Sequence, residues 1–349
     1  MQYLNELETT INDMVQKGRG ILAADESAPT IAKRFDAINV ESTEENRRLW
    51  RSTLLTTAGL GEYISGTILF EETLLQKTGD EKTDEGKTIA EAAWERNIVP
   101  GIKVDKGKIP LALSPGDLIT QGLDGLAERL RGYKEQGARF AKWREVYAIA
   151  GSNKAGHVPT QHGIEANAEM LARYAAVCQA EGVVPIVEPE VLMDGDHDID
   201  RHAEVTEAVQ QAVFNALNRH HVVLELMILK PNMVLPGKDN RRAQPDEVAE
   251  ATLKVLRRTV PAAMPSINFL SGGMGPEEST INLNAINQQA PDAPWKLSIS
   301  FGRALQQPAL QAWSGKAENI PAAQQALLKR AKLNHLAMQG EYKAAMEND

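Results

Sequence analysis

Short apolar segments alternate with longer helical patterns eight times along this 349-residue chain, and this alternation restricts the fold more than any other feature. Each short segment is rich in apolar or β-branched residues, which predicts a strand. The expected strands cover residues 20–25, 65–70, 99–104, 140–146, 184–190, 224–230, 266–270 and 296–301. Strands that alternate with helices form parallel sheets, and the number eight favours a closed (β/α)8 TIM barrel.

An open, doubly wound parallel sheet is the alternative architecture. Such a sheet carries a glycine-rich phosphate fingerprint after its first strand, and residues 21–30, ILAADESAPT, contain no glycine. The chain length suits one barrel, and a hydrophobic content of 42% can supply its core. We therefore expect an α/β barrel in a single domain over residues 1–349, with extra helices at about 4–17 and about 321–346.

Several residues predict where helices begin and end. Ser42 and Glu45 have the spacing of a capping box before an amphipathic segment. Proline suits the first turn of a helix, and glycine suits the position just after the last turn. These signals are expected at Pro245, Pro276, Gly137 and Gly182.

The overall charge and the cysteine content exclude several classes of function. A net charge of −9 without a basic block opposes binding to nucleic acid or to an anionic membrane. The single cysteine, Cys178, excludes an internal disulfide, and we expect it to be buried in the core. The N-terminus has no apolar signal segment, and no run of about 18 apolar residues occurs. We expect a soluble, cytoplasmic protein.

Charged side chains gather at the expected C-terminal ends of the strands, where barrels keep their active sites. Lys142 with Arg144, and Glu188 with Glu190, are two residues apart in a strand, so each pair shares a face. Lys230 ends the sixth expected strand, next to these two, and we expect the three strands to place their charges in one pocket. Uncompensated burial of ions is costly, which favours a functional site. Further polar residues at strand ends are Asp25, Ser27, Lys103, Asp105, Ser300 and Arg303.

A lysine among cations and carboxylates in a buried pocket has the surroundings that imine chemistry needs. Burial and the nearby Lys142 favour the neutral, nucleophilic form of Lys230, whereas the carboxylates oppose it and can transfer protons. The balance of these effects does not follow from the sequence.

A metal site is the weaker interpretation of the polar residues. The segment DGDHD at residues 194–198 contains oxygen and nitrogen ligands, and His220 and His221 are adjacent. Neighbouring histidines in a helix point about 100° apart and do not chelate one ion. DGDHD follows the fifth strand, where a loop and a helix N-cap are expected. We expect neither a metal nor a cofactor.

Seven segments together closely resemble class I fructose-1,6-bisphosphate aldolases, in order, from about residue 11 to residue 342. The segments are GILAADES (20–27), GIKVDKG (101–107), FAKWR (140–144), VPIVEPEVLMDGDHD (184–198), LKPNMVLPG (229–237), FLSGG (269–273) and FGRALQ (301–306).

The resemblance implies a role for each residue of the charged pocket. Lys230 in LKPN matches the lysine that forms the Schiff base, and Glu188 in VEPE matches the acid/base group of carbinolamine formation and dehydration. Glu190 would hold the lysine cluster, and Lys142 would assist at the C2 and C4 oxygens. Asp25 in AADES matches the group that takes the C4-hydroxyl proton as the C3–C4 bond breaks.

The resemblance also implies two phosphate positions. One lies on backbone amides near the last two strands, where barrels often bind phosphate. Its residues, together with a further substrate-binding serine, would be Ser271, Gly272, Gly302, Arg303 and Ser300. The distal phosphate would lie near Ser27, Arg34, Arg47 and Lys103, with Arg144 in the same wall. Thr30 stands where many relatives have serine.

The implied activity is reversible cleavage of fructose 1,6-bisphosphate to dihydroxyacetone phosphate and glyceraldehyde 3-phosphate, in glycolysis or gluconeogenesis, without a metal. One alternative is a Schiff-base barrel lyase for another phosphosugar, and another is a non-catalytic scaffold on the same fold. The presence of both Lys230 and Glu188 argues against the scaffold. Relatives of this length are often homotetramers, although the residues themselves predict no oligomeric state.

The C-terminus differs from the family members that end in a mobile tail with a terminal tyrosine. The sequence ends in AAMEND soon after Tyr342, which matches a family position before the tail. From this difference we expect bond cleavage to be retained and protonation of the enamine to be slow.

Overall fold

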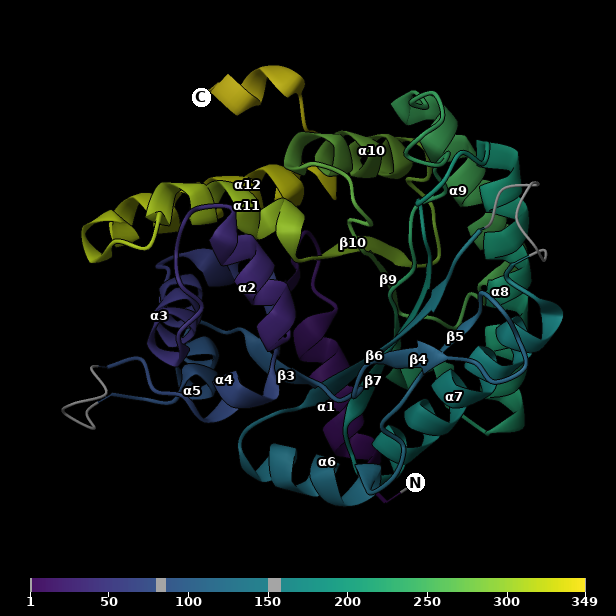
Figure 1. Cartoon of the computed structure of the whole chain (residues 1–349), viewed down its shortest axis with the longest axis horizontal. Coiled ribbons are helices and arrows are strands. Elements are labelled where there is room, and N and C mark those ends of the chain that lie inside the picture. Colours follow the sequence, from purple (N-terminus) through teal and green to yellow (C-terminus); the bar gives the residue numbers. More distant parts are fainter. Residues whose placement is uncertain (1, 80–85, 150–157, 349) are drawn as a thin grey trace.

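Eight parallel strands close into a barrel in the computed structural model, which describes residues 2–79, 86–149 and 158–348 (Figure 1). The strands are β1 (Gly20–Ala24), β2 (Ile64–Leu69), β3 (Val99–Lys103), β6 (Phe140–Tyr147), β7 (Val184–Val191), β8 (Ile228–Leu229), β9 (Ser266–Phe269) and β10 (Lys296–Phe301). They lie in chain order around the barrel, and β10 pairs with β1 to close it. The predicted (β/α)8 TIM barrel is confirmed.

Helices surround the barrel on its outer side (Figure 1). In chain order they are α2 (Ala28–Asp36), α3 (Glu44–Leu55), α4 (Glu71–Leu75), α5 (Ile89–Trp94), α6 (Leu126–Glu135), α7 (Gln161–Ala180), α8 (Ile199–Arg219), α9 (Pro245–Thr259), α10 (Pro276–Gln289) and α11 (Arg303–Trp313). Both expected extra helices are present, as α1 (Leu4–Met14) and α12 (Ile320–Ala337). Cys178 is buried within α7, as expected.

The interior of the barrel is apolar at its N-terminal end. Leu7 and Ile11 of α1 are buried in one cluster with Phe140 and Ile186 from the inner faces of the strands. Since side chains alternate along a strand, the same inner faces carry polar residues toward the C-terminal end. Helix α1 therefore covers one end of the barrel, and the functional cavity lies at the other.

Most of the predicted helix signals are confirmed. Pro245 and Pro276 open α9 and α10, and Gly137 and Gly182 follow α6 and α7 with φ of 97° and 73°. The predicted capping box at Ser42 and Glu45 is wrong by one position. Thr43 is the N-cap of α3, and its hydroxyl accepts a hydrogen bond from the amide of Asn46.

The sixth strand is shorter than expected. Residues Leu224–Leu226 form a 3-10 turn, and only Ile228–Leu229 pair as β8. The side chain of Gln179 bonds the backbone here: its amide group donates to the carbonyls of Val223 and Leu226. These carbonyls therefore accept their hydrogen bonds from a side chain of α7 and not from a neighbouring strand.

The terminal helices are also shorter than expected. Helix α1 ends at Met14 and not near residue 17, and α12 ends at Ala337 and not near residue 346. Gly340, with φ of 72°, turns the chain after α12, and a 3-10 turn at Ala344–Asn348 follows.

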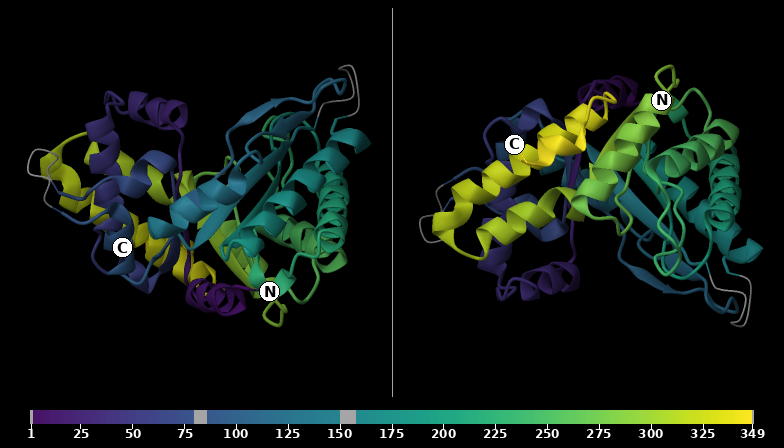
Figure 2. Two further views of the ribbon diagram at one scale, coloured as in Figure 1. Left: turned by 90° about the horizontal axis from the view of Figure 1, so that it is seen from below. Right: turned by 90° about the horizontal axis from the view of Figure 1, so that it is seen from above.

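A small hairpin that the sequence pattern did not predict lies between β3 and α6. It consists of β4 (Lys108–Pro110) and β5 (Leu118–Thr120), which pair antiparallel. Figure 2 shows it projecting from the barrel on the side away from α11 and α12. The segment was missed because each strand has three residues, β4 is exposed along its length, and proline interrupts the pattern.

No helix in the described ranges is long and apolar enough to cross a membrane.

Candidate active site

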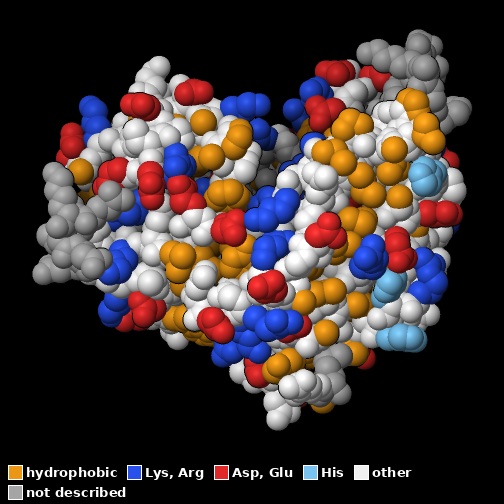
Figure 3. Space-filling view, turned by 60° about the horizontal axis from the view of Figure 1, so that its bottom comes forward, with side chains coloured by type: hydrophobic (Ala, Val, Ile, Leu, Met, Phe, Trp, Pro, Cys, Tyr) orange, Lys and Arg blue, Asp and Glu red, His pale blue; other side chains and the backbone are white. Residues whose placement is uncertain are grey.

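A cavity of about 1070 Å³ lies at the C-terminal ends of the barrel strands. Figure 3 shows the molecular surface hollowed between two raised rims, with lysine and arginine side chains on both. The lining includes nine cationic and six acidic side chains, although the whole chain carries a net charge of −9. The cavity is therefore a locally positive region of an acidic protein, suited to an anionic ligand.

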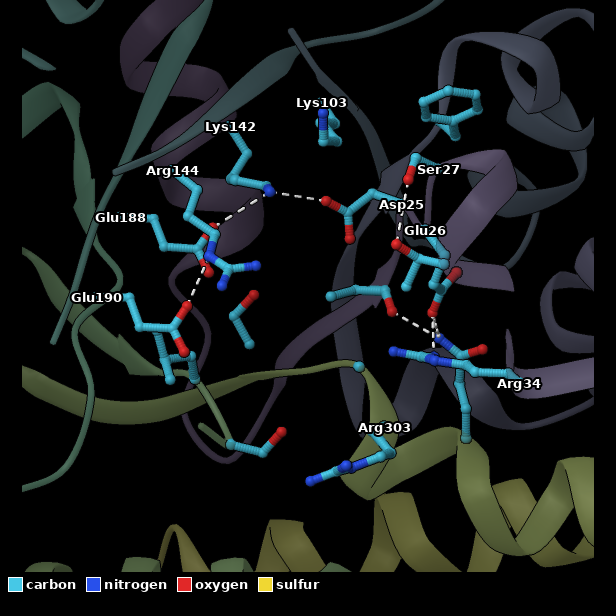
Figure 4. Close-up of a pocket in the computed structure, with 18 of the residues that line it drawn as sticks. Asp25, Glu26, Ser27, Arg34, Lys103, Lys142, Arg144, Glu188, Glu190 and Arg303 are labelled. Atoms are coloured by element: carbon cyan, nitrogen blue, oxygen red, sulfur yellow. Dashed lines mark hydrogen bonds and ion pairs between the residues drawn. The ribbon is translucent and has the colours of Figure 1, made fainter. Parts of the chain in front are cut away.

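Four charged side chains meet at the bottom of the cavity, and Figure 4 labels three of them, Asp25, Lys142 and Glu188. Lys142 Nζ lies 2.8 Å from Asp25 Oδ2 and 3.2 Å from Glu188 Oε2. The other oxygen of Glu188, Oε1, lies 3.3 Å from Lys230 Nζ. Glu188 thus lies between the two lysines. The fourth, fifth and sixth barrel strands therefore place their charges in one pocket, as expected.

The alternation of side chains in the strands puts these charges inside. In β7, Ile186 belongs to the inner apolar cluster, so Glu188 and Glu190 point inward above it. In β6, Phe140 fixes the same phase for Lys142 and Arg144. Lys142, Glu188 and Lys230 are each only 4% exposed.

The mutual pairing of these groups fixes their charges. Burial alone would raise the pKa of Asp25, but the fields of Lys142 and Lys230 hold that pKa well below its usual range. Burial alone would lower the pKa of Lys142, but Asp25, Glu188 and Asp105 raise it above the ordinary lysine value. At neutral pH the site therefore contains an ionised Asp25 beside a protonated Lys142.

Arg144 and Glu190 form a second pair, with Arg144 Nε 2.6 Å from Glu190 Oε2. Burial raises the pKa of Glu190, while Arg144 opposes that rise. Figure 4 places Arg144 beside Glu190, across the cavity from Ser27 and Arg34. Arg144 also lines the cavity, and β6 neighbours β3, which carries Lys103, so a place for Arg144 near the distal phosphate stays a prediction.

The residues expected around one phosphate lie together after β9 and β10. Ser271, Gly272, Gly302 and Arg303 all line the cavity. Gly272 has φ of 51°, a conformation that favours glycine and turns the backbone over the site. Gly302 is the N-cap of α11, whose first amides have no acceptor within the helix and can bind an anion.

Two further side chains complete this wall of the cavity. Arg303 Nη2 donates to the carbonyl of Gly273 at 2.6 Å. Ser300 is 1% exposed, and its hydroxyl has no hydrogen-bond partner among the described residues. A substrate hydroxyl or phosphate oxygen would satisfy it.

The residues expected near the distal phosphate separate into two groups. Ser27, Thr30, Arg34 and Lys103 line the cavity, where the Ser27 and Thr30 hydroxyls lie 3.1 Å apart. Arg47 does not line it. Two of its guanidinium nitrogens bind both oxygens of Glu72, and a third donates to the carbonyl of Ser42.

The sequence did not single out several residues that shape the site. Glu26 is 6% exposed and accepts from Arg34, Arg51 and the side-chain amide of Gln306. Arg51 and Gln306 lie 25 and 280 residues further along the chain, so no local spacing links them to Glu26. Lys33, next to Arg34 on α2, also lines the cavity. It is exposed on α2, as solvated surface lysines are, so the sequence did not indicate a role in the site.

The segment DGDHD forms a loop and a helix cap. The carboxylate of Asp198 accepts the amide of Arg201 at the start of α8, as expected. Asp194 pairs with Lys238 at 2.6 Å. In the described ranges, no group of three or more His, Cys, Asp or Glu residues is arranged to hold a metal ion.

A family model described as class I fructose-bisphosphate aldolase matches residues 6–349. The chain belongs to this aldolase family. Cytoplasmic isozyme 2 of fructose-bisphosphate aldolase from Pisum sativum is 53% identical over 99% of this chain and 93% of its own length. Fructose-bisphosphate aldolase from Drosophila melanogaster is 52% identical over 97% of this chain and 92% of its own length.

The same family appears among solved structures. Fructose-bisphosphate aldolase from Plasmodium falciparum, solved in complex with TRAP and a small-molecule inhibitor, superimposes with a TM-score of 0.93. It is 48% identical, and the match covers 98% of this chain and 96% of that one. These matches confirm the family that the seven sequence segments indicate. The superposition also confirms the fold.

Proposed function

We infer that this chain catalyses the reversible aldol cleavage of fructose 1,6-bisphosphate to dihydroxyacetone phosphate and glyceraldehyde 3-phosphate through a lysine imine. Membership of the class I aldolase family supports this activity, as do the names of the relatives. The observation that carries the proposed mechanism is the contact between Lys230 Nζ and Glu188 Oε1, at 3.3 Å, in a buried positive cavity.

Imine formation needs a neutral amine and a proton carrier. Lys142 is held cationic on the other oxygen of the Glu188 carboxylate, and a fixed cation disfavours a second one nearby. Glu188 takes a proton from Lys230, whose amine then attacks the C2 carbonyl of the open-chain sugar. The same carboxyl group returns a proton to the C2 hydroxyl, which leaves as water and gives the protonated imine.

Cleavage of the C3–C4 bond needs a base at the C4 hydroxyl. Asp25 is ionised, and its Oδ2 lies 2.8 Å from Lys142 Nζ, so Lys142 can orient both the carboxylate and the C4 oxygen. As Asp25 takes the hydroxyl proton, C4 becomes the aldehyde and the electron pair of the broken bond moves to the imine. The product on Lys230 is a neutral enamine, which takes a proton at C3 and is hydrolysed to dihydroxyacetone phosphate and free lysine.

Two walls of the cavity suit the two phosphates. One comprises the amide groups at Ser271, Gly272 and Gly302 with Arg303, and the other comprises Ser27, Thr30, Lys33, Arg34 and Lys103. A guanidinium can bind a phosphate through two hydrogen bonds, whereas an ammonium acts as a point charge. Arg47 is left out of this proposal because it does not line the cavity. The presence of both walls favours a bisphosphate over a monophosphate substrate.

Reductive trapping tests the role of Lys230. Borohydride added with dihydroxyacetone phosphate should inactivate the enzyme and leave the reduced adduct on the peptide that contains Lys230, as read by mass spectrometry. Lys230→Ala should remove nearly all activity, because no other group can accept the electron pair. Lys254→Ala, at an exposed position on α9, is the matched control and should be labelled like the wild type. Label on Lys142 or Lys103 would contradict the assignment.

We also propose that the protein works as a single domain in the cytoplasm and forms a homotetramer. The family match over residues 6–349 and the cytoplasmic isozymes among the relatives support the first two statements. Light scattering combined with size-exclusion chromatography measures the oligomeric state. A mass of one or two chains would contradict the tetramer.

A further inference from the structure

Lys230 lies at the point where a short barrel strand ends. β8 pairs with β7 at two positions and stops at Leu229. The described residues 230–237 that follow form neither strand nor helix, although all of them are buried. Buried backbone groups need hydrogen-bond partners, and outside a strand ladder side chains can supply them. The position of Lys230 therefore depends on contacts that the sheet pattern does not provide.

The side chain of Asn232 supplies a bond to β7 that the strand ladder lacks. The amide of Lys230 donates to the carbonyl of Val187 in β7 at 2.8 Å. The next residue of β7 that faces the same way is Pro189, which has no amide hydrogen to donate. Val191 follows in that direction, and its amide donates to Asn232 Oδ1 at 2.8 Å. Two bonds, four residues apart in β7, therefore fix the segment that carries Lys230.

These two bonds enclose the groups of the proposed imine reaction. Glu188 lies in β7 between Val187 and Val191. Glu188 Oε1 lies 3.3 Å from Lys230 Nζ, and Glu188 is the only acid that pairs with Lys230 among the described residues. A shift of the lysine segment along β7 would change this distance directly.

Helix α8, on the outer side of the barrel (Figure 1), fixes the orientation of the Asn232 side chain. Asn232 Nδ2 donates to Thr206 Oγ1 at 3.3 Å and to the carbonyl of Met233 at 3.1 Å. Thr206 Oγ1 in turn lies 3.4 Å from Nδ1 of His202, the next residue toward the start of α8 on the same face. Asn232 is 4% exposed, and both its oxygen and its nitrogen have partners. A buried amide with these bonds is held in one orientation.

We propose that Asn232 is a positioning residue for imine formation: it holds Lys230 Nζ at the distance from Glu188 at which a proton can pass between them. This inference rests on the proposed function. Asn232 is not among the described residues that line the cavity, so it acts through the backbone and not by contact with the substrate. The two phosphate walls should therefore bind a bisphosphate equally well without it.

Asn232→Ala should slow imine formation and leave the binding of a bisphosphate unchanged. The rate of imine formation with dihydroxyacetone phosphate is measured by rapid mixing and trapping with borohydride. It should fall about ten- to a hundredfold, because a displacement of about 1 Å in an active site can cost 10²-fold. Hexitol 1,6-bisphosphate has no carbonyl and forms no imine, so its Kd measures binding alone. That Kd should stay within about twofold of the wild-type value.

Thr252→Val is the matched control. The Thr252 hydroxyl in α9 is buried and accepts the amide of Val234, in the same segment, at 2.9 Å. This variant also loses a buried hydrogen bond, but one that does not join the segment to β7. It should be destabilised in urea unfolding, as Asn232→Ala is, and should form the imine at the wild-type rate. An equal loss of rate in both variants, or no loss in Asn232→Ala, overturns the proposal.

Thr206→Val provides a second test, which decides the matter if Asn232→Ala does not fold. It removes one acceptor of Asn232 Nδ2 and leaves the bond to Val191, so imine formation should slow by about threefold only. A wild-type rate in Thr206→Val contradicts the proposal. If the wild type neither cleaves the bisphosphate nor traps dihydroxyacetone phosphate on Lys230, the proposed function fails and this inference fails with it. Trapping on Lys230 at an unchanged rate in Asn232→Ala overturns this inference alone.

Discussion

Among the single residues of the site, Glu188 lies between two buried lysines. Its two oxygens lie 3.2 and 3.3 Å from Lys142 and Lys230. Asp25 binds only one of these two ammonium groups, through Lys142. Lys142 also lies 3.9 Å from Asp105 Oδ2 and so has three acidic partners, whereas Lys230 pairs with Glu188 alone among the described residues. This asymmetry between two lysines of equal burial supports the proposal that Lys230 is the nucleophile.

Arg303 tests the phosphate assignment at the same scale. Its guanidinium holds the carbonyl of Gly273 at the mouth of the cavity and has no acid partner in the described part of the chain. Arg303→Ala should weaken binding of the bisphosphate by about 1.5–3 kcal/mol for each charged hydrogen bond that is lost. An unphosphorylated analogue should be affected little. The measurement is kcat/KM for both substrates, with Lys254→Ala as the control for a general charge effect. Equal losses for both substrates would mean that Arg303 supports the fold only.

At the scale of elements, a buried carboxyl joins a barrel strand to an inserted hairpin. Glu145 points outward from β6 and bonds Thr120 at the end of β5 and Trp143 in its own strand. The hairpin has only three residue pairs of its own, so this anchor and the Thr120 hydroxyl fix its position on the rim.

The stability of this anchor should depend on pH. Burial raises the pKa of Glu145 from 4.5 to about 7, although the hydrogen bonds from Trp143 and Thr120 lower it in part. The folded protein therefore keeps a proton that the unfolded chain releases above about pH 4.5. The contribution to the free energy of unfolding is fully present below that pH and is lost as the pH rises through about 7.

The Glu145→Gln variant isolates this effect, because its side chain has the same shape and does not titrate. Between pH 5 and 8 the wild type should lose roughly 2–3 kcal/mol of stability relative to the variant. Urea unfolding at several pH values measures the difference. A difference between the two proteins that does not vary with pH would refute the raised pKa. A constant offset is expected as well, since glutamine can accept only one of the two hydrogen bonds.

In the whole molecule, the barrel brings charges from strands that are not neighbours into one cavity. The described residues include no cluster suited to a metal. The electron-accepting role that a metal could fill is assigned to the imine of Lys230 in the proposed mechanism. Activity should therefore persist after exhaustive dialysis against EDTA, measured as the rate of bisphosphate cleavage. Loss of activity that added zinc restores would contradict the mechanism.

The order of the barrel elements and the charges that point into the barrel can both be predicted from the amino-acid sequence. Both follow from local rules: strands and helices have distinct periodicities, and residues two apart in a strand share a face. Lys142, Glu188 and Lys230 could therefore be placed together before the structure was known. The motifs around them were long enough to indicate the family correctly.

The pairing of charges across the cavity depends instead on how the chain packs in three dimensions. Asp25 and Lys142 come from β1 and β6, which are not neighbours in the barrel, and only its closure brings them within 2.8 Å. Arg47 pairs with Glu72, 25 residues further along the chain, and Arg34 pairs with Glu26, because long side chains can reach several partners and the packing of the segments decides which one is near. The β4–β5 hairpin also depends on the tertiary structure, since bonds from Thr120 to β6 hold it and its short strands give no clear sequence pattern.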